Sequence, residues 1–299
     1  MPSRRITRLE TVSVSVPETA LEAFEAALGS VCDTVGWFRD DASGAWHVEG
    51  VKAVGSRDAE LAAALALAAG LTGTPAPLER RETPAEGWLA RTYASFPEQR
   101  IGRLFAVRGT HLPDRATHGR ITLLLDAGLA FGSGEHGSTR GCLLALERAA
   151  RRRPRRILDL GTGSGILAIA AVRLLRRSVL ATDIDPWSVR VARENARLNH
   201  VAHLVRPIRA DGWRDARVRA AGPYDLVFAN ILARPLCAMA RHLAANLAPG
   251  GAAILSGLLT GQVRAVLAAH RPHGLRLEGM TVAGPWATLL LRHPGGERA

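Results

Sequence analysis

The chain has 299 residues, of which 47% are hydrophobic and 22% charged, and its formal net charge at pH 7 is +12. The length favours two domains, and the composition excludes an intrinsically disordered chain. The longest apolar stretch, Leu61–Leu71, is about half of the roughly 20 residues that a transmembrane helix needs, so we expect no membrane span and a cytoplasmic protein.

The first part of the chain predicts a small domain of alternating strands and helices. The order of its expected elements is β-α-β-β-α-β, which is that of a ferredoxin-like α+β fold. We expect this domain over residues 1–85, followed by a connection over residues 86–115 that contains a strand-like stretch at Arg103–Val107. The expected elements are Thr11–Val16, Glu18–Leu28, Thr34–Phe38, Ala45–Val51, Asp58–Leu71 and Leu78–Arg81.

Residues 116–299 predict a larger domain in which short apolar strands alternate with helices. This alternation is typical of a parallel sheet with helices on both faces, so we expect a seven-stranded, doubly wound, Rossmann-like α/β domain. The last two strands are separated only by Ala-Gly-Pro, which is too short for a helix, so they must form an antiparallel hairpin. The expected strands are Ile157–Leu160, Val179–Asp183, Val205–Ala210, Leu226–Ala229, Ala252–Leu255, Leu275–Val282 and Trp286–Arg292.

The strongest local signal is a glycine-rich turn after the first strand of the larger domain. Residues 157–165 read Ile-Leu-Asp-Leu-Gly-Thr-Gly-Ser-Gly and lead from a buried strand into an apolar helix. Gly161 and Gly163 let a ligand approach the backbone without a Cβ in the way. In an open parallel sheet this turn lies at the default ligand site. The glycine spacing differs from the dinucleotide fingerprint, which argues against a nicotinamide dehydrogenase.

Acidic side chains follow the next two strands. Asp183 ends the second strand, where a carboxylate can accept hydrogen bonds from both hydroxyls of a ribose. The alternative is that Asp183 or Asp185 only caps the helix that follows Pro186, and we favour ribose binding for Asp183 and capping for Asp185. Asp211 follows the third strand, where it can meet a base, although a plain turn explains it nearly as well.

An asparagine ends the fourth strand, and its carbonyl oxygen can orient the amine of a substrate. This residue, Asn230, can alternatively cap the next helix. Upstream, a glycine-rich loop precedes Ser138 and Thr139, whose hydroxyls can cap a helix or lie over a bound carboxylate. His136 has no cysteine or carboxylate at metal-ligand spacing, and the three cysteines are far apart, so we expect no metal site.

These motifs together resemble the class I methyltransferases, and specifically the PrmA family. The resemblance rests on Asp159–Gly165, Asp183–Pro186 and Asn230–Ala233, and it covers most of residues 120–292. The sequence Asn-Ile-Leu-Ala matters because DNA- and glutamine-directed relatives usually carry proline-proline-aromatic after this asparagine. One departure is Gly137, which stands where the family usually has proline. The added backbone freedom predicts weaker cofactor binding.

The resemblance implies a cofactor, a substrate and a set of contacts. S-adenosylmethionine is the implied cofactor, and its expected contacts are Thr139, Gly161, Gly163, Asp183 and Asn230, with Asn230 also the expected catalytic residue. The implied substrate is protein eleven of the large ribosomal subunit, free or at the stalk base, methylated on α-amino and lysine ε-amino groups. The small N-terminal domain is then the substrate-recognition domain.

The basic charge keeps two alternatives open. One is a class I methyltransferase of another protein or of RNA, and the other is a basic RNA- or ribosome-binding module with a non-catalytic cofactor site. The dense run Arg151–Arg156 suits a contact with ribosomal RNA, but biased codon usage on surface positions and a helix C-terminus that favours cations also explain it. Intact glycines, Asp183 and Asn230 argue against a degenerate site.

Overall fold

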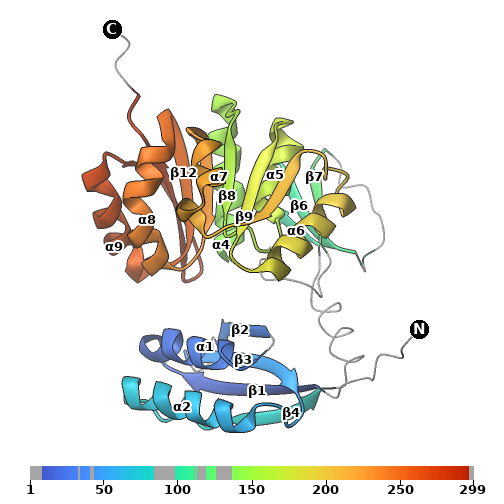
Figure 1. Ribbon diagram of the computed structural model, residues 1–299, viewed down its shortest axis with the longest axis vertical. Helices are drawn as coiled ribbons and strands as arrows, with labels where there is room; N and C mark the ends of the chain where they lie inside the picture. The colour runs from blue at the N-terminus through green and yellow to red at the C-terminus, as the bar shows by residue number, and fades with distance from the viewer. Residues whose placement is uncertain are drawn as a thin grey trace. The chain divides into compact units, whose positions relative to one another are not determined.

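The computed structural model describes residues 9–32, 34–40, 44–83, 98–110, 112, 119–125 and 137–295. The chain divides into two compact units, residues 1–92 and residues 93–299 (Figure 1). None of the helices within these described ranges is long and apolar enough to cross a membrane.

The first unit is a four-stranded antiparallel sheet with two helices. Its strands lie in the order β2-β3-β1-β4, and α1 packs against α2 (Figure 1). Residues alternate along β1, where Val12, Val14 and Val16 are buried and Ser15 is exposed, so one face of the strand joins the core. The elements are β1 (Leu9–Val16), α1 (Leu21–Gly29), β2 (Thr34–Arg39), β3 (Trp46–Ala53), α2 (Asp58–Thr72) and β4 (Glu79–Thr83).

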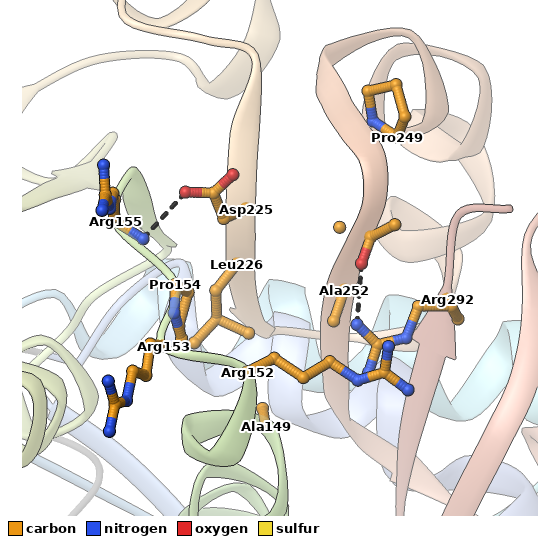
Figure 2. A pocket seen from close by; sticks show the side chains of 12 residues that line it. Ala149, Arg152, Arg153, Pro154, Arg155, Asp225, Leu226, Pro249, Ala252 and Arg292 are labelled. Carbon is orange, nitrogen blue, oxygen red and sulfur yellow. Dashed lines mark hydrogen bonds between the residues drawn. The ribbon is translucent and has the colours of Figure 1, made fainter. Parts of the chain in front are cut away.

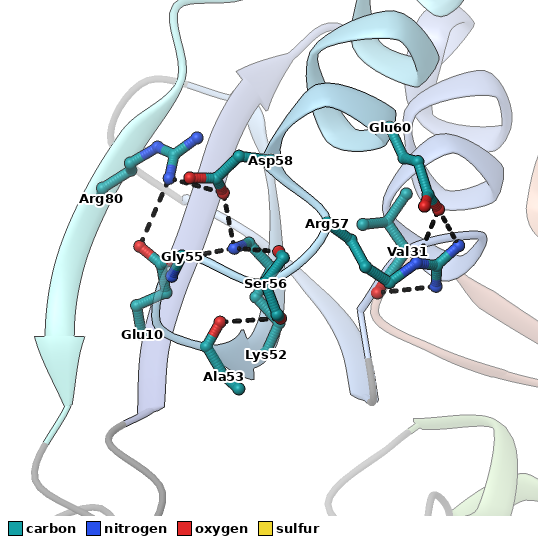
Figure 3. A network of polar contacts seen from close by, with 10 residues as sticks. All are labelled: Glu10, Val31, Lys52, Ala53, Gly55, Ser56, Arg57, Asp58, Glu60 and Arg80. Atoms are coloured by element: carbon teal, nitrogen blue, oxygen red, sulfur yellow. Dashed lines mark hydrogen bonds and ion pairs between the residues drawn. The ribbon is translucent and has the colours of Figure 1, made fainter.

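An ion cluster around the buried side chains of Lys52 and Glu10 joins the strands of this unit to the start of α2 (Figure 3). Lys52 is 1% exposed, and its Nζ lies 2.5 Å from Glu10 Oε1 and 2.7 Å from Asp58 Oδ1. Arg80 of β4 lies 3.0 Å from the same oxygen of Asp58. Burial raises the pKa of Glu10, but hydrogen bonds from Lys52 and Gly55 and the nearby cations outweigh it, so this pKa lies below its usual value.

The second unit is built on a seven-stranded sheet in the order β10-β9-β8-β11-β12-β14-β13. The strands from β10 to β12 are parallel, and the winding direction changes between β8 and β11. Strand β14 is antiparallel to both β12 and β13, which confirms the predicted terminal hairpin. The strands are β8 (Ile157–Leu160), β9 (Val179–Asp183), β10 (Val205–Arg209), β11 (Tyr224–Asn230), β12 (Leu247–Leu259), β13 (Arg276–Ala283) and β14 (Trp286–Arg292).

Helices cover both faces of this sheet, because successive side chains of its central strands point to opposite sides. Ile157 and Phe228 belong to a core shared with α4, α5 and α6. Their chain neighbours Leu158 and Val227 belong to a second core, shared with α7, α8 and α9 (Figure 1). The helices are α4 (Gly137–Ala149), α5 (Ile166–Leu175), α6 (Pro186–Leu198), α7 (Ala216–Ala220), α8 (Ala233–Asn246) and α9 (Val263–His270).

A second, three-stranded sheet completes this unit. Strand β6 (Phe105–Gly109) pairs with β5 (Gln99–Ile101) and, in parallel, with β7 (Ile121–Leu125). The buried side chains of Ile101 and Phe105 join the core on the α4 face. Both β5 and β6 fall within the segment predicted as a connection, where the strand-like stretch at Arg103–Val107 overlaps β6, and their buried side chains join the core shared with α4 and α5.

Candidate active site

The glycine-rich turn lies at the carboxyl end of β8, beside the point where the winding direction changes. Gly161, Gly163 and Gly165 have φ values of +66°, +51° and +81°, a region that side chains other than glycine rarely adopt. A Cβ on Gly161 would also collide with the side chain of Ile231, which follows the predicted Asn230. The turn therefore needs glycine both for its backbone conformation and for its close contact with the end of β11.

The structure brings Asp183 to this turn. Its Oδ2 accepts a hydrogen bond of 2.9 Å from the Gly163 amide, and its Oδ1 accepts one of 3.1 Å from the Asp185 amide. The N-terminus of α6 is capped by Asp185 instead, whose carboxylate accepts from the amides of Trp187 and Ser188, as predicted. The carboxylate of Asp183 is thus fixed at the end of β9 without being used as a helix cap.

A second contact brings Asn230 and Thr139 together from segments far apart in the sequence. Asn230 Nδ2 lies 3.5 Å from Thr139 Oγ1, at the outer limit of a hydrogen bond. The first turn of α4, which carries Thr139, is anchored by Ser256, whose hydroxyl donates 3.3 Å to the Ser138 carbonyl and contacts Thr288 Oγ1 at 2.7 Å. Three strand ends and one helix start therefore contribute to one region.

The backbone just after Asn230 packs closely against Gly257 of β12. Its φ is +80°, and a Cβ there would lie 2.5 Å from the Ile231 carbonyl oxygen and 2.9 Å from the Ile231 nitrogen. Both atoms are backbone, so they cannot move aside as a side chain can. The Ile231 amide also donates a hydrogen bond of 3.1 Å to the Ser256 carbonyl. The direction of the chain just after Asn230 is therefore set by β12.

Two other predicted positions have different outcomes. Asp211 lies close to the site, because the amide of Ala210 donates to the Asp183 carbonyl, but its carboxylate pairs with Arg214 at 2.9 Å. That pairing fits the alternative of a plain turn.

The glycine-rich loop at residues 131–134 and His136 lie outside the described residues. Within the described part of the chain, no group of three or more His, Cys, Asp or Glu side chains is placed to hold a metal ion.

Comparison with known proteins decides the family. A family model described as "Ribosomal protein L11 methyltransferase (PrmA)" matches residues 21–294. The chain belongs to this family. A ribosomal protein L11 methyltransferase from Bradyrhizobium diazoefficiens is 51% identical over 213 residues, which are 71% of this chain and 72% of that protein. One from Rhodopseudomonas palustris is 40% identical over 300 residues, covering 97% of this chain and 92% of that protein.

A solved structure supports membership in the PrmA family. The crystal structure of a ribosomal protein L11 methylase from Lactobacillus delbrueckii subsp. bulgaricus matches with a TM-score of 0.61 and 32% identity. The match covers 66% of this chain and 98% of that one. The resemblance to the PrmA family that the sequence motifs predict is therefore confirmed.

This PrmA-family chain also holds a buried carboxylate to which the sequence pattern alone assigns no role. Asp159 of β8 is 1% exposed. Its Oδ2 accepts hydrogen bonds of 2.6 Å from the Thr162 hydroxyl and 3.2 Å from the Ala168 amide, whereas no described group bonds to its Oδ1. Burial raises the pKa of Asp159 to about 6, although these hydrogen bonds lower it. The only signal in the sequence is one acidic residue inside an otherwise apolar strand.

Replacing Asp159 by asparagine is expected to make stability less dependent on pH. The folded state holds the proton more tightly than the unfolded state, because its pKa of about 6 exceeds the usual 3.8. The stability that this proton provides is present below pH 4 and is lost as the pH rises through 6. In urea unfolding, the unfolding free energy of Asp159→Asn should rise relative to that of wild type by about 3 kcal/mol between acid and neutral pH. If the difference in unfolding free energy between wild type and Asp159→Asn stays constant with pH, the pKa of Asp159 is not raised.

Proposed function

We propose that this member of the PrmA family transfers methyl groups from S-adenosylmethionine to α-amino and lysine ε-amino groups of ribosomal protein L11. The observation that carries the proposal is the pairing of Asn230 with Thr139 beside the glycine turn and Asp183. A cofactor and an amine must meet at such a site, and the carboxyl edge of a doubly wound sheet is where ligands bind. The substrate in this proposal is free or lies at the ribosomal stalk base.

The residues at the turn fit S-adenosylmethionine. Each oxygen of Asp183 accepts one backbone hydrogen bond, which leaves further lone pairs on the carboxylate for two ribose hydroxyls. Gly161 and Gly163 present backbone without a Cβ, and Ile184 gives an exposed apolar side chain just beyond Asp183. When bound, S-adenosylmethionine supplies a methyl group on a sulfonium, which is already a good leaving group. The protein then needs to position the reactants, and it needs no nucleophile of its own.

Asn230 is the proposed catalytic residue. Its Nδ2 is directed to the Thr139 hydroxyl, so its Oδ1 is the atom that remains to accept an N–H from the substrate amine. This bond turns the nitrogen lone pair in a defined direction. An amide takes up no proton at neutral pH, so the amine must arrive neutral. That costs about 1 kcal/mol for an α-amino group and about 4.6 kcal/mol for lysine at pH 7.

The first unit is the proposed substrate-recognition domain. Its strand order, β2-β3-β1-β4, with the element order β-α-β-β-α-β, is that of a ferredoxin-like fold. The larger unit has its own two cores, so it does not need the first unit to build the glycine turn. A separate domain for recognition lets a general methyl-transfer site act on one particular protein.

The proposed function is tested by mass spectrometry of ribosomal protein L11 after incubation with the chain and S-adenosylmethionine. Wild type should add mass in steps of one methylene, and Asn230→Ala should lower kcat by roughly tenfold to 100-fold because the amine loses its orientation. Asn246→Ala is the matched control, since Asn246 ends α8 and donates to the His242 carbonyl one turn earlier in the same helix. No mass gain with wild type, or equal rates for the two variants, contradicts the proposal.

A further inference from the structure

A pocket of about 280 Å³ lies at the amino ends of the parallel strands (Figure 2). The glycine turn lies at the carboxyl ends of these strands. It is enclosed by the segment between α4 and β8, by the start of β11 and by Pro249–Ala252 of β12. Arg292, at the end of β14, closes it from the antiparallel hairpin. The proposed methyltransferase site uses none of these residues.

The lining of this pocket is strongly basic. Four arginines contribute to it, and Figure 2 shows the side chain of Arg152 extending toward the guanidinium of Arg292. The only acidic residue in the lining is Asp225, and its Oδ2 already accepts hydrogen bonds of 2.8 and 2.9 Å from the amides of Arg155 and Arg156. One further carboxylate, Glu278, pairs with both Arg292 and Arg152 outside the lining. The arginines therefore outnumber the acids that face them. The arginines of the lining are Arg152, Arg153, Arg155 and Arg292.

One guanidinium nitrogen in the pocket wall lacks an acceptor. Arg292 Nη1 donates 2.8 Å to the Gly250 carbonyl and Nε donates to Glu278, whereas the buried Nη2 has no hydrogen-bond partner among the described residues. A buried charged donor without an acceptor is costly, and native structures rarely contain one without a reason. An oxyanion in the pocket would satisfy it.

The arginine run changes direction at Arg153, which ends the 3-10 turn Ala150–Arg152 after α4. Arg153 has φ +52° and ψ +55°, the left-handed conformation in which helices commonly end, and its amide donates to the Ala150 carbonyl. This turn lets Arg152 and Arg155, which flank it, line the same pocket.

We propose that this pocket binds a phosphate group, and that an RNA backbone carries it. Paired guanidinium groups match phosphate oxygens in shape and charge better than any neutral ligand does. RNA is the favoured source because the exposed Arg151 and Arg156 continue the run on either side of the lining, where neighbouring phosphates of a backbone would lie. The net charge of +12 adds to the attraction.

The test compares two double variants that remove the same charge. Arg152→Gln with Arg155→Gln alters the pocket, and Arg241→Gln with Arg264→Gln alters exposed positions on α8 and α9. Fluorescence anisotropy with a labelled RNA hairpin is measured at several salt concentrations. The pocket variant should bind about tenfold more weakly and lower the slope of log affinity against log salt by about 1 to 2, while the control keeps the wild-type slope. Calorimetry with S-adenosylmethionine checks that both variants keep the wild-type fold.

A second arm identifies the source of the phosphate. Inorganic phosphate is titrated into wild type and into the pocket variant, and binding is followed by thermal shift and phosphorus NMR. Binding of phosphate by wild type alone, without binding of RNA, supports the pocket and assigns it to a small phosphate ligand. The proposal is overturned if the two double variants lose RNA affinity equally, since overall charge then explains the binding. It is also overturned if wild type and the pocket variant respond identically to both ligands.

Discussion

Asp183→Ala is expected to weaken binding of S-adenosylmethionine on the order of 100-fold, as measured by calorimetric titration. The proposed pair of charge-assisted hydrogen bonds to a ribose is worth about 3 kcal/mol, and alanine removes both. The same change frees the Gly163 amide, which now donates 2.9 Å to Asp183 Oδ2, so the glycine turn also becomes less well ordered.

Asp185→Ala is the matched control for this experiment. Asp185 lies two residues after Asp183, and its replacement removes the N-cap of α6. The free energy of unfolding should fall by about 1 kcal/mol, while the affinity for the cofactor stays near that of wild type. Equal losses of affinity in the two variants would mean that the strand end, and not the carboxylate of Asp183, determines binding. Wild-type affinity in Asp183→Ala would remove this residue from the proposed site.

Lys52→Met is expected to destabilise the first unit by about 3 kcal/mol. The change leaves the carboxylate of Glu10, whose side chain is 7% exposed, without its closest cation, and an unpaired buried charge is strongly unfavourable. This loss of stability is at the lower end of the range for breaking a buried ion pair, because Asp58 and Arg80 are partly exposed and water can solvate them. Hydrogen exchange of the β1 and β3 amides in the full chain measures the loss.

The surface pair Arg57–Glu60 provides the comparison for Lys52. Arg57 is 48% exposed, so Arg57→Met should lower the free energy of unfolding by less than about 1 kcal/mol. The lowered pKa of Glu10 also predicts the pH dependence. The stability that this cluster provides is present above the usual pKa of glutamate and is lost as the pH falls. The difference in unfolding free energy between wild type and Lys52→Met should therefore become smaller in acid. Similar losses in the two methionine variants would show that the cluster is not effectively buried.

Much of the candidate site can be predicted because its residues end parallel strands. Gly161, Asp183 and Asn230 each follow a short apolar run, and the carboxyl ends of parallel strands meet at one edge of a sheet. The hairpin at the end of the chain is predictable for a similarly local reason, since its connection is too short for a helix. These inferences need only a strand and the residues that directly follow it.

The features that escape prediction depend on tertiary packing, which a short run of residues does not show. The burial of Asp159 depends on α5 folding back to bring the Ala168 amide to its carboxylate. The strand-like stretch predicted at Arg103–Val107 is found as β6, but nothing local shows that β5 and β6 join the core of the second unit. The arginine run suggests a polyanion contact by itself, but Arg292 reaches the same pocket from the last strand, more than a hundred residues later.

The anchoring of α4 on β12 and β14 determines when in its synthesis the protein can become active. Thr139 lies in a helical turn that rests on Ser256 and Thr288, and a side chain at Gly141 would collide with Thr288. These partners are translated more than a hundred residues after Thr139, whereas the contacts of the first unit are complete once β4 has been made. We expect nascent chains arrested before β14 to show a protected first unit in hydrogen exchange and to bind no S-adenosylmethionine. Binding by such chains would contradict this order. The proposed recognition domain would thus fold, and be able to meet its substrate, before the proposed methyl-transfer site is complete.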